Sequence, residues 1–198
     1  HLVGVAKQAV KNVHLLPRFE TELPLVDDIR GFKNISPPAF RWQDKAVEKI
    51  TQWKITQPED IKGFFAVNMA STGCGKTFAN AKVMQALSQN GQSLRYILAL
   101  GLRTLTLQTG DEYRVRIGLD SSELAVLIGS NAVNELHNQS KVDDKFKSQE
   151  IGSESQETLL YENIEYDGEI PEEGLATVLT KEKDRQFLYA PVLACTID

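Results

Sequence analysis

Residues 63–77 read Gly63-Phe-Phe-Ala-Val-Asn-Met-Ala70-Ser-Thr-Gly-Cys-Gly-Lys-Thr77, and this stretch decides the fold. Its first half is an apolar run with the length of a buried strand. Its second half fits the phosphate-binding pattern G-x-x-x-x-G-K-[ST], with Ala70 in the first position. A helical pattern then continues from Lys76 to Gln89 and stops at Asn90-Gly91. The order of strand, glycine-rich loop and helix predicts a site for a nucleoside triphosphate.

The loop contains the residue types that phosphate binding requires. Gly73 and Gly75 allow the backbone to turn so that successive N–H groups point at phosphate oxygens, and the following helix adds its positive N-terminal end. We expect Lys76 to contact the β- and γ-phosphates of ATP and the Thr77 hydroxyl to ligate Mg²⁺, so these two residues are the expected catalytic groups. The loop residues expected to bind the nucleotide are Ser71, Thr72, Gly73, Cys74, Gly75, Lys76 and Thr77.

Further strands and helices alternate along the chain after the loop. Apolar runs predict strands over residues 94–100, 124–128 and 189–198, and helical spacing predicts a helix over 103–115. Strands that alternate with helices are typical of a parallel sheet covered on both faces. We therefore expect an α/β fold, a P-loop NTPase domain. No helical stretch follows the last apolar run, so the domain is expected to be incomplete at its C-terminus.

Three segments lie outside this alternation. Residues 2–16 have the apolar spacing of a helix and residues 17–38 are broken by prolines, so residues 1–38 are expected to be a helix and a linker, interpreted as the tail of a preceding domain. A helix is expected over 41–54, within a domain that covers 39–198. Residues 131–185 are polar and acidic and predict an insertion that is solvated and loosely ordered, an interpretation we favour over one that docks a basic partner.

The composition limits the classes of function. With 41% hydrophobic and 25% charged residues and no long apolar run, the chain is predicted to be soluble, with no membrane partner. Its only two cysteines, Cys74 and Cys195, and its three histidines follow no metal-ligand spacing, which favours a cytoplasmic setting and predicts no metal-dependent nuclease centre. Cys74 lacks a nearby second cysteine, so a small tolerated residue is favoured over a redox switch. The net charge of −5 is concentrated between Asp143 and Glu173, which leaves a mildly basic remainder compatible with nucleic acid.

Several stretches, in this order, resemble the helicases of superfamily 2. Phe40-Arg-Trp-Gln43 precedes the loop as an aromatic-x-x-Gln element does in that superfamily, whose own loop also begins with Ala. Ala99-Leu-Gly-Leu-Arg-Thr-Leu-Thr-Leu-Gln108 is similar to motif Ia, and Val192-Leu-Ala-Cys-Thr-Ile-Asp198 to motif Ib. The resemblance implies the N-terminal part of a first RecA-like domain. It also implies that Gln43 binds the adenine of ATP, and that Arg103, Gln108 and Thr196 contact the DNA backbone.

The residue sequence of these stretches is most similar to that of the helicase-nuclease of type I CRISPR interference, especially subtype I-F. Membership of that family implies ATP-driven translocation along single-stranded DNA and recruitment by an RNA-guided surveillance complex. It also implies a separate metal-dependent nuclease domain that degrades foreign DNA.

The sequence departs from that machinery in two respects. It contains no Asp-Glu-x-His or Asp-Glu-x-Asp stretch after a strand, and it lacks the arginines of a second motor domain. Phosphoryl transfer depends on several such groups, so we expect the chain alone to bind nucleotide weakly and to hydrolyse it barely. Two alternatives stay open at this point. One is the motor subunit of a restriction or DNA-repair helicase, and the other is a nucleotide-gated binding module without enzymatic activity.

Overall fold

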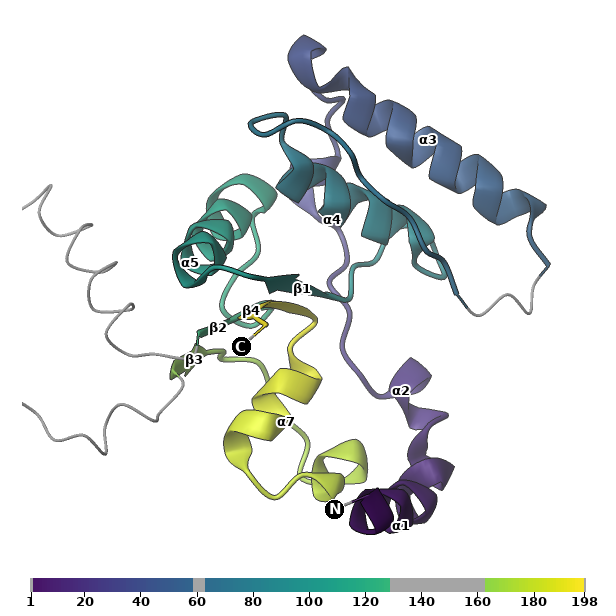
Figure 1. Cartoon of the computed structure of the whole chain (residues 1–198), viewed down its shortest axis with the longest axis vertical. Coiled ribbons are helices and arrows are strands. Elements are labelled where there is room, and N and C mark those ends of the chain that lie inside the picture. Colours follow the sequence, from purple (N-terminus) through teal and green to yellow (C-terminus); the bar gives the residue numbers. More distant parts are fainter. Residues whose placement is uncertain (1, 59–62, 129–162, 198) are drawn as a thin grey trace, which may run out of the picture.

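A four-stranded sheet lies at the centre of the computed structural model, which describes residues 2–58, 63–128 and 163–197 (Figure 1). The strand order is β1-β4-β2-β3, in which β1, β4 and β2 are parallel and β3 is antiparallel to β2. The strands are β1 (Tyr96–Leu100), β2 (Leu124–Ile128), β3 (Asn163–Glu165) and β4 (Val192–Thr196). The open parallel sheet confirms the α/β class, and the three parallel strands fall within the three apolar runs at 94–100, 124–128 and 189–198.

Helices cover both faces of this sheet, as the apolar runs predicted. On one face lie α4 (Lys76–Leu87) and α5 (Arg103–Glu112), which continues into a π-helical turn at Tyr113–Ile117. On the other lies α7 (Glu182–Tyr189), drawn in yellow in Figure 1. Because neighbouring residues of a strand point to opposite faces, Leu124 and Val126 belong to the core beneath α4 and α5, whereas Ala125 packs with Tyr189 of α7.

The strand predicted over residues 63–70 is not formed. The backbone there has no regular secondary structure, and the side chains of Phe65 and Met69 are 90% and 89% exposed. A strand is stable only when its N–H and C=O groups pair with those of a neighbour. Among the described residues no strand lies beside this segment, and β1 pairs only with β4. The apolar run therefore has the composition of a strand, but it does not form one because no neighbouring strand among the described residues pairs with it.

The N-terminal segment contains more helix than predicted and is no simple linker. Within the predicted helix and linker lie α1 (Leu2–Asn12), η1 (Val13–Leu15), α2 (Arg18–Thr21) and η2 (Arg30–Phe32). The short η3 (Pro38–Phe40) and α3 (Arg41–Thr56), the helix predicted over 41–54, follow. Between α2 and η2 the side chains of Leu23, Val26 and Ile29 are buried, and Val26 forms an isolated bridge with Leu94. Prolines prevent regular structure here, but they do not prevent single apolar residues from filling the core.

The acidic insertion predicted over residues 131–185 lies partly outside the described residues. Its described part, from residue 163, contains regular elements and three buried side chains, those of Tyr166, Leu175 and Ala176. It contains β3, the 3-10 helix η6 (Gly174–Val178) and the start of α7. Leu175 and Ala176 of η6 are fully buried against the face of the sheet that α7 covers. The few apolar residues of this stretch are therefore enough to fix it to the core.

Candidate functional site

The glycine loop, residues 70–77, makes two sharp turns before α4 begins. Gly73 and Gly75 have φ angles of 80° and 74°, a left-handed conformation that favours glycine. The Cys74 N–H donates to the Ser71 carbonyl over 3.3 Å. A Cβ atom on Gly75 would lie 2.7 Å from the side-chain nitrogen of Gln43, so no larger residue fits there. The glycines are thus required by the backbone conformation and by the close approach of α3.

The two expected catalytic residues lie at the junction of the loop and α4. The Lys76 ammonium reaches back across the loop and donates to the Ala70 carbonyl over 2.7 Å. The carbonyl of Thr77 accepts a hydrogen bond from the Tyr113 hydroxyl over 3.1 Å, which ties the start of α4 to the helical segment after α5. Ser71, Thr72 and Gly73 are exposed, and the following loop residues are half-buried. The loop therefore combines a positive charge with an accessible backbone.

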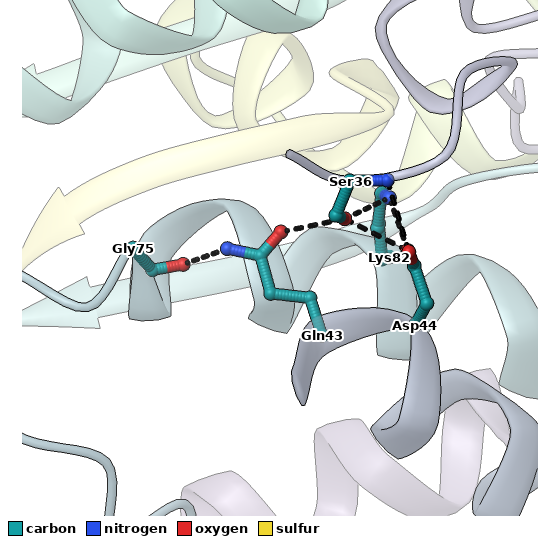
Figure 2. A network of polar contacts seen from close by, with 5 residues as sticks. All are labelled: Ser36, Gln43, Asp44, Gly75 and Lys82. Atoms are coloured by element: carbon teal, nitrogen blue, oxygen red, sulfur yellow. Dashed lines mark hydrogen bonds and ion pairs between the residues drawn. The ribbon is translucent and has the colours of Figure 1, made fainter. Parts of the chain in front are cut away.

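Two neighbouring side chains of α3 donate hydrogen bonds to backbone carbonyls of the glycine loop. Trp42 donates its indole N–H to the Cys74 carbonyl over 3.1 Å. Gln43 donates its amide N–H to the Gly75 carbonyl over 3.0 Å, and Figure 2 shows this second bond. Gln43 is buried, and its side-chain oxygen accepts from the Ser36 hydroxyl over 3.2 Å. The sequence predicted that Gln43 binds the nucleotide, and in the structure Gln43 contacts the glycine loop. Its observed partners are protein groups, so adenine binding by Gln43 stays a prediction.

An ion pair between the buried Lys82 and the partly exposed Asp44, missed in the sequence, lies next to Ser36, the hydrogen-bond partner of Gln43. The Lys82 ammonium lies 2.9 Å from both Asp44 Oδ1 and the Ser36 hydroxyl oxygen. Asp44 also accepts from the Ser36 N–H at 2.9 Å and lies 2.8 Å from the Ser36 hydroxyl. Desolvation acts to raise the pKa of Asp44, but the hydrogen bonds from Lys82 and Ser36 outweigh it and lower that pKa. One signal was available, because Lys82 shares a helical face with the buried Ala79 and Ala86, and a buried ammonium requires a partner.

The residues expected to contact nucleic acid divide into two groups. Leu100 and Thr196 lie opposite each other in neighbouring parallel strands, so Thr196 and Arg103, the first residue of α5, are near the same carboxyl edge of the sheet. Both side chains are half-buried. Gln108 lies further along α5 and is exposed. The structure thus brings Arg103 and Thr196 to one edge and leaves Gln108 apart from it.

Metal and membrane features were searched in the described ranges. Within residues 2–58, 63–128 and 163–197, no group of three or more His, Cys, Asp or Glu side chains could hold a metal ion. Both cysteines are free, and burial raises the pKa of the Cys195 thiol. In the same ranges no helix has the length and apolar character needed to cross a membrane.

Comparison with known proteins finds relatives that match the chain along its whole length. No protein-family model matches it. Two curated proteins do, each named "CRISPR-associated nuclease/helicase Cas3 subtype I-F/YPEST". The protein from Pectobacterium atrosepticum is 44% identical and that from Pseudomonas aeruginosa 41% identical, in both cases over the full chain. The chain spans 18% of the length of each relative. These matches confirm the resemblance predicted from the motifs.

Proposed function

We propose that this chain, related along its whole length to a segment of the subtype I-F CRISPR-associated nuclease/helicases, is an ATP-binding part of a single-stranded DNA translocase in CRISPR interference. The observation that carries the proposal is the glycine loop, with two left-handed glycines, the Lys76 ammonium across it and a helix that begins at its end. No observation favours a restriction or DNA-repair motor, or a binding module without activity.

The residues of the loop fit Mg²⁺-bound ATP. The carbonyls of Cys74 and Gly75 are drawn toward α3 by Trp42 and Gln43, and this leaves backbone N–H groups as the partners for phosphate oxygens. In our proposal Lys76 exchanges the Ala70 carbonyl for a phosphate oxygen, and the Thr77 hydroxyl ligates Mg²⁺. When bound, the nucleotide supplies the phosphoryl group whose transfer to water would drive movement.

A nucleic-acid partner is proposed for the carboxyl edge of β1 and β4. Arg103 and Thr196 lie there, at the strand ends where ligands gather in open α/β sheets. We propose that they contact phosphates of single-stranded DNA, with Gln108 as a peripheral contact. A cytoplasmic location, recruitment by an RNA-guided surveillance complex, and a nuclease centre in another part of a full-length protein follow from the family relationship as further parts of the proposal. The chain alone is proposed to hydrolyse ATP barely, because it lacks a second acidic motif.

Titration with a fluorescent ATP analogue and Mg²⁺ tests the nucleotide site. Lys76→Ala should weaken binding by about tenfold or more, since it removes a charge-assisted hydrogen bond to phosphate. Lys33→Ala is the control, because Lys33 is an exposed lysine paired with Asp28. Equal affinities for the wild type and Lys76→Ala would exclude the loop as the phosphate site.

The translocase activity is tested in a full-length protein that contains these residues. ATP hydrolysis should increase when single-stranded DNA is added, because a motor couples phosphoryl transfer to its track. The same rate with and without DNA would rule out translocation and leave nucleotide binding standing.

A further inference from the structure

We propose that Ser36, Asp44 and Lys82, called here the lysine cluster, are positioning residues for the nucleotide. They fix the orientation of the Gln43 amide, which holds the Gly75 carbonyl of the glycine loop, and they act without touching the nucleotide (Figure 2). This inference rests on the proposed binding of ATP by that loop.

Of the two possible orientations of the Gln43 amide, only one satisfies its hydrogen-bond partners. A backbone carbonyl only accepts hydrogen bonds, so Gln43 must present its NH₂ group to the Gly75 oxygen 3.0 Å away. Its own oxygen then faces Ser36, whose hydroxyl is the donor at 3.2 Å. Gln43 is 3% exposed, so water is a poor substitute for that donor. The hydrogen bond from Gln43 to the Gly75 carbonyl thus depends on which acceptor receives the proton of the Ser36 hydroxyl.

The Ser36 hydroxyl has one proton and two acceptors within reach. Asp44 Oδ1 lies 2.8 Å away and the Gln43 oxygen 3.2 Å away, so an uncompensated Asp44 carboxylate would take the proton. Lys82 donates to that same Asp44 oxygen, and the Ser36 N–H donates to the other. Lys82 also donates to the Ser36 oxygen itself, which leaves the hydroxyl proton to point away from the ammonium. The hydroxyl proton is shared between these two acceptors, and the positive charge of Lys82 offsets the carboxylate and so increases the share that reaches Gln43.

The consequence for the loop is a backbone arranged before any ligand arrives. The Gly75 carbonyl accepts from the Ala79 N–H of α4 over 3.1 Å as well as from Gln43, so the Gln43 amide is the second donor that keeps it turned away from the phosphate oxygens. Ordering the loop in advance removes a cost that binding would otherwise include. Trp42 holds the Cys74 carbonyl independently of the lysine cluster. Loss of the cluster should therefore weaken nucleotide binding without abolishing it.

The test uses the 198-residue chain and four variants. Lys82→Met removes the charge and keeps much of the side-chain volume, Ser36→Ala removes the hydroxyl, and Lys82→Arg is the conservative rescue. Glu22→Gln is the matched control, because Glu22 accepts from Leu175 and Tyr189 in a partly buried network far in sequence from the loop. For each variant, affinity for the fluorescent ATP analogue is measured where urea unfolding curves show a fully folded protein, and hydrogen exchange is followed for amides 71–77.

Lys82→Met and Ser36→Ala should each weaken nucleotide binding about tenfold and speed amide exchange in the loop, since a buried polar group loses its partner. Lys82→Arg should remain within about twofold of wild type. Glu22→Gln should lower stability and leave both readouts unchanged.

Wild-type affinity and exchange in folded Lys82→Met would overturn the inference, as would equal weakening by Glu22→Gln. If Lys76→Ala loses binding while Lys82→Met keeps it, only this inference fails. If the wild type and Lys76→Ala both bind no nucleotide, the proposed function fails and takes this inference with it.

Discussion

Tyr113 connects the start of α4 to the sheet through its hydroxyl. It donates to the Thr77 carbonyl and bonds the hydroxyl of Tyr96 on β1. Desolvation raises the pKa of Tyr113 to about 12, so the hydroxyl remains a donor at neutral pH. Tyr113→Phe keeps the ring but removes the side-chain donor to the Thr77 carbonyl and leaves the buried Tyr96 hydroxyl without its partner. We expect the free energy of unfolding to fall by about 1–3 kcal/mol, measured by urea denaturation.

Tyr166→Phe is the matched control for this change. The Tyr166 ring is also buried, and its hydroxyl donates to the Tyr189 carbonyl on the opposite face of the sheet. Both substitutions should cost stability, but only Tyr113→Phe should also weaken nucleotide binding, because Tyr113 holds the backbone of Thr77. Unchanged stability in Tyr113→Phe would contradict the hydrogen bonds described for it.

Single residues of the site could be predicted where a local pattern defines them. Gly73, Gly75 and Lys76 follow from the spacing of the loop; both glycines have positive φ angles and Lys76 begins α4, while their contact with a nucleotide stays a prediction. The partners of Lys82 could not be found in this way, because Ser36 and Asp44 lie 46 and 38 residues away from it in sequence. Their meeting depends on the packing of α3 against α4, which no local pattern specifies.

Gly110 sets the distance between α5 and the sheet. A Cβ atom at this position would lie 2.6 Å from a methyl carbon of Val126 on β2. Although alanine favours a helix more than glycine does, Gly110→Ala requires that either the buried Val126 side chain or α5 shifts. We expect a loss of about 1–3 kcal/mol in the free energy of unfolding, measured by urea denaturation.

Two further variants identify the cause of that loss. Gly101→Ala, just before α5, meets no atom within 4 Å and should change stability by less than about 0.5 kcal/mol. Adding Val126→Ala to Gly110→Ala should recover part of the loss, because the clash is removed and the two sites interact directly. An additive double variant would show that Gly110 is needed for some reason other than its contact with Val126.

Elements were predicted well where their signal is local. Helical spacing located α3, α4 and α5, and apolar runs located β1, β2 and β4, because each of these patterns is contained within the element. The run at 63–70 failed as a strand because a strand also needs a neighbour. The prediction of a linker was wrong because Val26 and Ile29 are buried individually, and the apolar residues of this segment follow no helical or strand periodicity. In the same way, β3 and η6 were missed in a polar stretch whose few apolar residues are the ones that pack.

At the scale of the whole molecule, acid should unfold the protein by protonating carboxylates whose folded-state partners lower their pKa. The hydrogen bond from Tyr189 is the main cause that lowers the pKa of Glu22, and the bond from Lys33 lowers that of Asp28. Asp44 has a lowered pKa as well. Lowered folded-state values mean that the unfolded chain binds more protons, so this stability is complete above the ordinary values of 4.5 and 3.8 and is lost as the pH falls through the folded ones. Urea unfolding from about pH 7 to about pH 3 should show this decline. Glu22→Gln should make it shallower, and an unchanged slope in that variant would contradict the assigned role of Glu22.

The distribution of charge over the molecule determines what a DNA-binding measurement can distinguish. The net charge of −5 is concentrated between Asp143 and Glu173, so a basic residue elsewhere could bind DNA either at a defined contact or through a diffuse field. In a full-length protein, Arg103→Ala should weaken binding of single-stranded DNA and reduce the slope of log affinity against log salt by about 0.7, the value for one phosphate contact. Gln108→Ala should leave that slope unchanged, because the side chain is neutral. Arg116→Ala is the matched control, since Arg116 lies beyond the C-terminal end of α5 and pairs with Glu112. If Arg116→Ala reduces the slope as much as Arg103→Ala does, the attraction is diffuse and the carboxyl edge of the sheet is not the DNA contact.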